Sequence, residues 1–357
     1  MSSVARIPSE TLQGADPLHV VSGADERFLD GLFVTLASSL LWIGAGTHVI
    51  FHILDGGISA SSRTRLQKCA SRWYPQCQIH FYPVEQSRFA GFTSGIANSR
   101  MYYARFLMPS LIPAGKVIYL DADTLVLDNL CLLSSLWRPG DCVLAVRDRK
   151  IRSLSDDCPW SLDSGEGVRP YFNTGVMVAD LDRWRRCGVE KRAMELAREA
   201  GPNCRWYDQT VFNYLFRSDF RVIPDAWNWQ SEILPEAGVS IVHFSSEKKP
   251  WKVLAPDVRF QIWRSVLKAT ENSPLNAVLR NEGPMGVVRG AFERAIRSNI
   301  LARAALVPLL LACAGRPAAA GIRAYYRQGP GGRRHSEQIS RAHPALLRVV
   351  SRLGYSS

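Results

Sequence analysis

Two aspartates spaced two residues apart follow a short apolar strand in the first half of the chain. The predicted strand is Val117–Leu120, and the aspartates are Asp121 and Asp123. Side chains at positions i and i+2 of an extended backbone point to the same side, so we expect both carboxylates to face one point. They would repel each other there unless a divalent cation such as Mn²⁺ or Mg²⁺ accepted their oxygens. The spacing therefore indicates a metal site, and a solvated turn that caps the next helix is the alternative.

A second predicted strand ends on a histidine. This strand covers residues 239–243, and His243 is followed by a turn that contains Lys249 and Trp251. Neutral imidazole is a common ligand of Mn²⁺, and a lysine is a compact charge that suits a diphosphate. A surface histidine before a basic loop is the alternative. Two carboxylates and one imidazole would supply three protein ligands, and a diphosphate could fill the remaining positions.

Polar residues elsewhere in the chain could contact a sugar or its diphosphate. Asn173 could hydrogen-bond a hydroxyl group, while Gly175 would let a ligand approach the backbone. Asp208 could accept hydrogen bonds from hydroxyl groups, and Gln209 could face the anomeric carbon. Arg105 could balance a diphosphate or the acidic cluster. The alternatives are a turn-capping Asn173, an Asp208 that caps the following helix, and a plain surface Arg105.

The elements that must position these residues alternate between strand and helix. This order favours an α/β layered domain with a mostly parallel sheet, in which ligands bind at the carboxyl ends of the strands. A helix that starts near residue 98 should stop before Pro109, and Ser59 should cap another helix. We expect strands at residues 18–22, 48–54, 78–82, 117–120, 143–146, 172–178 and 239–243, and helices at 28–40, 59–71, 98–108, 182–199, 208–216 and within 252–275.

The formal net charge of +12 is unevenly distributed along the 357 residues. Twelve arginines, no lysines and three acidic residues lie after residue 280, so this segment carries +9 and the rest of the chain only +3. A near-neutral body argues against a nucleic-acid-binding protein. We expect an N-terminal extension at residues 1–16, a catalytic domain at 17–280 and an Arg-rich, partly helical tail at 281–357.

The basic tail is predicted to contact a membrane surface. Its arginines alternate with apolar residues at the spacing of an amphipathic helix on anionic lipid, namely Val288, Phe292, Ile296 and Ile300. A flexible basic tail without a partner is the alternative. The eight cysteines lack metal-site spacing, and the N-terminus lacks the apolar segment of a secretory signal. We therefore expect a cytoplasmic protein that attaches peripherally to the inner face of the membrane.

Six ordered motifs across residues 18–252 resemble those of retaining glycosyltransferase family 8. The family includes bacterial lipopolysaccharide galactosyl- and glucosyltransferases and, more distantly, glycogenin. The resemblance implies a GT-A type nucleotide-diphospho-sugar transferase fold, with a Rossmann-like mixed sheet flanked by helices. It also implies UDP-sugar donors, Mn²⁺ (or Mg²⁺) as the metal, and retention of the anomeric configuration. The motifs are ADERF, a Tyr-Ala-Arg helix, YLDADTLVLDNL, YFNTGVMVADLDRWR, YDQ and HFSSEKKPW.

The resemblance further implies a role for individual residues. Because an amide is a poor nucleophile, Gln209 behind the anomeric carbon favours a front-face mechanism, in which the leaving group and the acceptor share one side. Two departures from the family pattern are Arg27, where the family usually has Asn or a similar polar residue, and Ser246, where it has Gly. The implied roles are Asp121, Asp123 and His243 as metal ligands, Lys249 at the diphosphate, Asp25 at the nucleotide, Arg105 at the sugar-diphosphate, and Asn173, Asp208 and Gln209 around the transferred sugar with Asp148 nearby.

The expected function is transfer of a hexose, galactose or glucose, from a UDP-sugar to a saccharide or lipid-linked saccharide such as lipopolysaccharide core. A metal-dependent nucleotidyltransferase is one alternative, but residues 23–26 are acidic and do not form a basic Gly-rich phosphate loop. A non-catalytic sugar- or nucleotide-binding protein is another, and it would not need Asp121 and Asp123 together with His243. No nucleic acid is expected as a partner.

Overall fold

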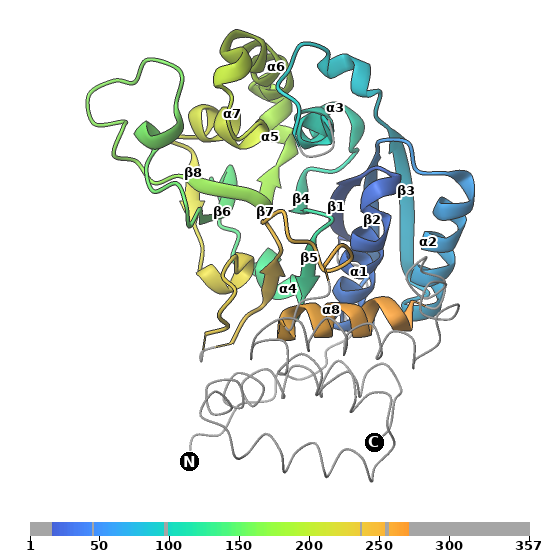
Figure 1. Ribbon diagram of the computed structural model, residues 1–357. Coiled ribbons are helices and arrows are strands. Elements are labelled where there is room, and N and C mark those ends of the chain that lie inside the picture. The colour runs from blue at the N-terminus through green and yellow to red at the C-terminus, as the bar shows by residue number, and fades with distance from the viewer. Residues whose placement is uncertain (1–15, 45, 96–98, 236–237, 254–256, 271–357) are drawn as a thin grey trace, which may run out of the picture.

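A seven-stranded mixed sheet forms the centre of the molecule (Figure 1). The computed structural model describes residues 16–270, apart from 45, 96–98, 236–237 and 254–256. Within this sheet β7 alone runs antiparallel to its neighbours, so the expectation of a mostly parallel sheet is confirmed. In spatial order the strands are β3 (Cys77–Pro83), β2 (Val49–Asp55), β1 (Leu18–Ala24), β4 (Lys116–Leu120), β7 (Phe172–Asp180), β6 (Val143–Arg147) and β8 (Phe220–Val222).

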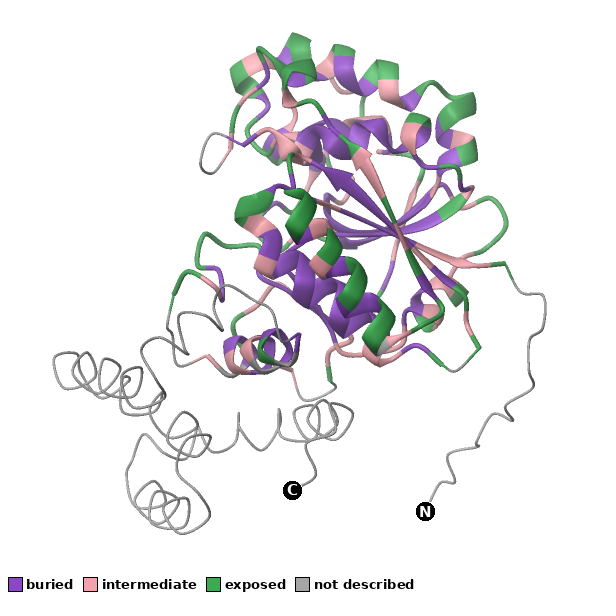
Figure 2. Cartoon of the chain, turned by 90° about the vertical axis from the view of Figure 1, so that its right-hand side faces the viewer, coloured by how far each residue is buried: buried purple, intermediate pink, exposed green. Residues whose placement is uncertain are grey.

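Helices cover both faces of this sheet and form a core on each face. Alternate residues of a strand therefore enter different cores: Ile118 packs with α1 and α8, while Tyr119 packs under α5 and α7. Figure 2 shows the buried strands enclosed by helices whose outward faces are exposed. The helices are α1 (Leu29–Leu41), α2 (Ala60–Trp73), α3 (Met108–Leu111), α4 (Leu130–Ser135), α5 (Leu181–Arg186), α6 (Val189–Ala200), α7 (Asp208–Leu215) and α8 (Val258–Ala269).

A second, two-stranded sheet lies beside the carboxyl end of β4. It pairs β5 (Thr124–Val126) with β9 (Ile241–His243) in antiparallel register, and Thr124 lies opposite His243. The predicted strand at residues 239–243 is therefore shorter than expected, and its partner β5 was not predicted. This pairing places His243 next to Asp123, although 118 residues of chain lie between Thr124 and His243.

Three local predictions were tested by the structure. Ser59 caps α2 as expected, because its hydroxyl accepts a hydrogen bond from the backbone of Ser62. Pro109 does not end a helix: a 3₁₀ helix at Met101–Leu107 continues into α3, whose first turn accommodates Pro109 because a first-turn N–H needs no partner. The helix predicted at residues 182–199 is two helices, α5 and α6, divided at Gly188 with a left-handed φ of 62°.

The Asp121–Asp123 segment is a turn and not an extended strand. Strand β4 ends at Leu120, and the Thr124 amide donates to the Asp121 carbonyl at 3.2 Å. The argument from side-chain alternation was therefore wrong, and the turn itself brings the two carboxylates together. Helix α1 packs against this turn, with the Thr35 hydroxyl donating to the Thr124 carbonyl at 3.0 Å.

The predicted N-terminal extension lies outside the described residues except for its last position, and the predicted basic tail lies wholly outside them. None of the helices in the described part of the chain combines the length and the apolar character needed to cross a bilayer.

Replacing Gly31 in α1 by alanine should destabilise the protein, although alanine alone favours a helix by about 1 kcal/mol. A methyl group at Gly31 would clash with the Ala122 carbonyl in the Asp121–Asp123 turn and would come within 3.0 Å of the Trp251 ring. We expect a loss of about 1–3 kcal/mol in urea unfolding. Gly44→Ala is the matched control, with open space around its added methyl, and should change stability by less than about 0.5 kcal/mol. Equal stability of both variants would show that helix and turn are not in close contact.

Candidate active site

All ten residues singled out as candidate site residues line one cavity of about 430 Å³. The cavity lies at the carboxyl ends of β1 and β4, where open α/β sheets bind ligands. The start of β7, the start of α7 and the segment after β9 line its other sides. The ten residues are Asp25, Arg105, Asp121, Asp123, Asp148, Asn173, Asp208, Gln209, His243 and Lys249.

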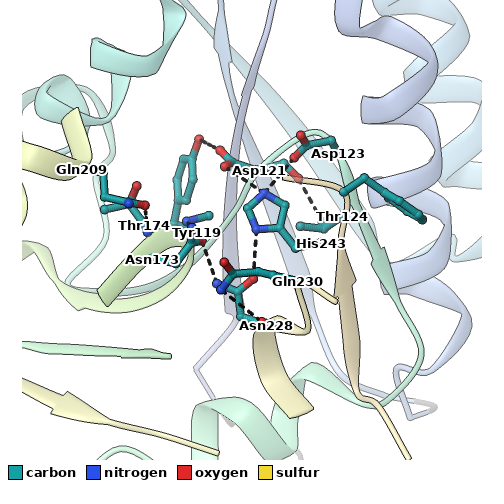
Figure 3. A network of polar contacts seen from close by, with 12 residues as sticks. Tyr119, Asp121, Asp123, Thr124, Asn173, Thr174, Gln209, Asn228, Gln230 and His243 are labelled. Atoms are coloured by element: carbon teal, nitrogen blue, oxygen red, sulfur yellow. Dashed lines mark hydrogen bonds and ion pairs between the residues drawn. The ribbon is translucent and has the colours of Figure 1, made fainter. Parts of the chain in front are cut away.

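Asp121, Asp123 and His243 form a cluster that fits a divalent cation. One ligand atom from each residue lies within 4.8 Å of the others. The Nε2 atom of His243 is 3.3 Å from Asp123 Oδ1 and 3.6 Å from Asp121 Oδ2 (Figure 3). Asp123 Oδ1 is buried and receives no hydrogen bond within the described part of the chain. An anionic oxygen buried in this way requires a positive partner, and two carboxylates with an imidazole suit Mn²⁺ or Mg²⁺.

Lys249 supports the charge on Asp123. Its ammonium donates to Asp123 Oδ2 at 2.5 Å and to the Phe244 carbonyl at 2.6 Å, and the residue is buried. Burial alone would raise the pKa of Asp123, but Lys249 and His243 hold this pKa well below its usual range. Asp123 is therefore ionised at neutral pH, as a metal ligand must be.

Arg105 joins the metal cluster to the side of the cavity that α7 forms. Its guanidinium donates to Asp121 Oδ1 at 2.5 Å, to Asp208 Oδ2 at 2.6 Å and to the Thr174 hydroxyl at 2.6 Å. It lies over the Tyr119 ring at 4.6 Å, and the Tyr119 hydroxyl also donates to Asp121. Only 4% of Arg105 is exposed, so the alternative of a surface arginine is wrong.

Asp208 is a buried carboxylate that does not cap its own helix. It is the first residue of α7, Tyr207 occupies the cap position, and no side chain caps the helix, so the capping alternative is wrong. Burial raises the pKa of Asp208 to about 7, against the opposing charge of Arg105. Tyr207 has a φ of 55° and stacks on Tyr102. This conformation is costly for a residue with a Cβ and is typical of functional sites.

Gln209 and Asn173 are held by one carboxylate, Asp148. Asp148 Oδ2 accepts from Asn173 Nδ2 at 3.0 Å and from Gln209 Nε2 at 3.2 Å, while its Oδ1 accepts from two backbone amides of the following loop. The Gln209 oxygen accepts from the Thr174 amide at 3.1 Å. The orientation of the Gln209 amide is therefore set at both ends, and Asp148 has a larger part in the geometry than its sequence position indicated.

Gly175 is needed for close packing between protein side chains. A Cβ there would lie 2.7 Å from His243 Nδ1 and 2.8 Å from Asp121 Oδ2. Gly175 also lines the cavity, so the expectation that it lets a ligand approach the backbone stays a prediction.

Arg27 and Ser246, the two departures from the family pattern, relate to the cavity in different ways. The Arg27 guanidinium donates to Asp25 Oδ2 at 2.5 and 3.1 Å, so the carboxylate of Asp25 is already paired where it meets the cavity. Ser246 lines the cavity directly. Sequence reasoning assigned no individual role to several further lining or bonded residues, because nothing in their spacing separates them from ordinary core or surface residues: Tyr102, Tyr119, Lys150, Thr174, Asn228, Gln230 and Glu247.

Replacing Asp208 by asparagine should make stability less dependent on pH. An aspartate has a pKa of about 3.9 in an unfolded chain, whereas burial raises the pKa of Asp208 to about 7 in the folded protein. Between about pH 3.9 and about pH 7, Asp208 therefore keeps a proton in the folded protein that it has lost in the unfolded chain. The stability that this proton provides decreases as the pH rises and is lost by about pH 7. Urea unfolding of metal-free protein at about pH 5 and about pH 7.5 measures the effect. Wild type should lose more stability than Asp208→Asn; equal losses would show that Asp208 is ionised throughout.

Comparison with known proteins identifies the family. The model of glycosyl transferase family 8 matches residues 19–255. General stress protein A of Bacillus subtilis is 24% identical over 263 residues, which cover 66% of this chain and 87% of that protein. Lipopolysaccharide 1,2-glucosyltransferase of Escherichia coli K12 is 24% identical over 278 residues, which cover 72% of this chain and 78% of that protein.

The solved structures agree on the fold. The galactosyltransferase LgtC, in complex with donor and acceptor sugar analogs, matches with a TM-score of 0.63 and 24% identity, covering 74% of this chain and 100% of that chain. The expected GT-A type fold is confirmed, and these matches do not favour a nucleotidyltransferase or a non-catalytic binding protein. Since the family model spans more than half of the sequence, the chain belongs to glycosyl transferase family 8 and is a retaining glycosyltransferase.

Proposed function

We propose that this enzyme transfers a hexose, galactose or glucose, from a UDP-sugar, with Mn²⁺ or Mg²⁺ held by Asp121, Asp123 and His243. The observation that carries the proposal is this cluster of ligand atoms within 4.8 Å, at one side of a cavity large enough for a nucleotide-sugar. When bound, a divalent cation neutralises charge on the departing diphosphate. Lys249 would assist, because its ammonium has three N–H donors and two of them are used within the protein.

Residues around the sugar would orient it without attacking it. The Asp208 carboxylate is buried against Arg105 and Thr174, and the Asp148 carboxylate accepts hydrogen bonds from two side-chain amides and two backbone amides. Gln209 presents an amide, which is a poor nucleophile. These constraints support a front-face reaction, in which the protein holds the sugar while the leaving group and the acceptor meet on one side.

The acceptor is proposed to be a saccharide or a lipid-linked saccharide such as a lipopolysaccharide core. The names of two similar proteins, a lipopolysaccharide 1,2-glucosyltransferase and a galactosyltransferase crystallised with donor and acceptor sugar analogs, support this class. Trp206 and Tyr207 line the cavity and offer aromatic faces to a sugar ring. Attachment of the chain to a membrane through residues 281–357 stays a prediction, since these residues lie outside the described part.

Purified enzyme with Mn²⁺ should release UDP slowly from one UDP-hexose in a panel. EDTA should abolish this release, and Asp123→Ala should lower it by more than about 100-fold, because loss of a residue that only supports a metal ligand already costs about 10–100-fold. Asp128→Ala is the matched control: Asp128 follows β5, the strand after this turn, but does not line the cavity, and its variant should keep the activity.

If no donor is hydrolysed, calorimetry with UDP and Mn²⁺ separates two explanations. Binding of UDP that needs Mn²⁺ and is lost in Asp123→Ala would keep the proposal and point to an obligatory acceptor. Absence of binding would contradict it.

Intact mass spectrometry during turnover tests the front-face reaction. We expect no hexose adduct on the enzyme, since the carboxylates near the sugar are all engaged. A trapped adduct on Asp148, Asp208 or Gln209 would establish a double displacement instead.

A further inference from the structure

A chain of hydrogen bonds runs from Asp148 to the cluster of Asp121, Asp123 and His243, and Figure 3 shows its part from Asn173 through Asn228 to His243. Asp148 accepts from Asn173, Asn173 accepts from Asn228 at 2.9 Å, and Asn228 meets His243 Nδ1 at 3.0 Å. Asn228 and His243 are 1% and 4% exposed, so water cannot replace these contacts cheaply. None of the sequence motifs pointed to Asn228.

The direction of every bond in this chain follows from one backbone amide. The Gly175 N–H, which can only donate, bonds to Asn173 Oδ1 at 3.0 Å. Asn173 Oδ1 is therefore an acceptor, and Asn228 must present its NH₂ group to it. The carboxylate of Asp148 on the other side of Asn173 requires the same orientation, because it accepts from the Asn173 NH₂ group.

The oxygen of the Asn228 amide then determines which ring nitrogen of His243 carries the proton. This oxygen faces His243 Nδ1 and can only accept, so Nδ1 carries a proton. In a neutral imidazole the lone pair is then on Nε2, the atom that faces Asp123 Oδ1 at 3.3 Å and Asp121 Oδ2 at 3.6 Å.

We propose that Asn228 is a positioning residue for the metal site, which holds the proton of His243 on Nδ1 and directs the Nε2 lone pair towards the cation. Metal-binding histidines generally need a partner on the second ring nitrogen, and loss of such a partner weakens metal binding about 10–100-fold. The proposal rests on the proposed function only for the presence of a divalent cation, and not for the identity of the sugar donor.

Two substitutions distinguish the role of the Asn228 amide oxygen from that of its NH₂ group. Asn228→Asp keeps an acceptor oxygen for His243 but loses the donor to Asn173, while Asn228→Leu loses both. We measure Mn²⁺ binding to the protein without nucleotide, from the electron paramagnetic resonance signal of free Mn²⁺. Asn228→Asp should bind Mn²⁺ within about threefold of wild type or more tightly, and Asn228→Leu should bind about 10–100-fold more weakly.

Ser38→Ala is the control for a general loss of stability. The Ser38 hydroxyl is buried and accepts from the Val126 amide, so its loss disturbs the same two-stranded sheet without touching His243. This variant should bind Mn²⁺ like wild type even if it unfolds at a lower temperature. Wild-type affinity in folded Asn228→Leu, or equal weakening in both Asn228 variants, would overturn the proposal for Asn228 and leave the cation site intact. Wild-type protein that binds neither Mn²⁺ nor Mg²⁺ would overturn the cation site as well.

The ring nitrogens of His243 give a second readout that does not depend on activity or affinity. We label the histidines with ¹⁵N, load the wild type with Mg²⁺ and record nitrogen NMR spectra, in which His243 is assigned by comparison with His243→Gln. In the wild type, Nδ1 of His243 should carry the proton. Asn228→Asp should keep this state, and Asn228→Leu should lose the preference. A proton on Nε2 in the wild type would contradict the proposal directly.

Discussion

Mutual repulsion between carboxylates is the constraint around which this site is built. Asp121, Asp123 and Asp208 all face one cavity, and two buried basic side chains hold them there. Arg105 bridges Asp121 and Asp208, while Lys249 bonds to Asp123. These pairs leave the Asp123 oxygen nearest to His243 without a hydrogen-bond donor in the described part of the chain. The protein thus neutralises only part of the negative charge that it gathers at this cavity.

Much of the fold was predictable because its signals are local. Short apolar runs and turn residues located six of the seven strands of the central sheet, and the polar ends of those strands indicated where a ligand binds. The short edge strand β8 had no comparable signal. The division between α5 and α6 was missed, since a glycine inside a helical pattern is often tolerated and only the left-handed φ of Gly188 shows the break.

The internal geometry of the site was less predictable, because it depends on contacts between distant segments. The turn at Asp121–Asp123 could not be told from an extended strand by spacing alone. Arg105 could not be told from a surface arginine, since its three partners come from β7, the turn after β4 and α7. The contact of Asn228 with His243 was not predicted, because the role of an asparagine between two tryptophans depends on what its amide touches.

The pairing of β5 with β9 has a consequence for how the enzyme matures. Asp121 and Asp123 precede β5 and His243 ends β9, so the 119 residues between Asp123 and His243 must be synthesised before the three side chains can meet. Closing such a long loop costs entropy that only the finished central sheet can offset. During synthesis the two aspartates therefore exist for a time without their imidazole. The three side chains therefore come together late, only after every strand of the central sheet has been synthesised.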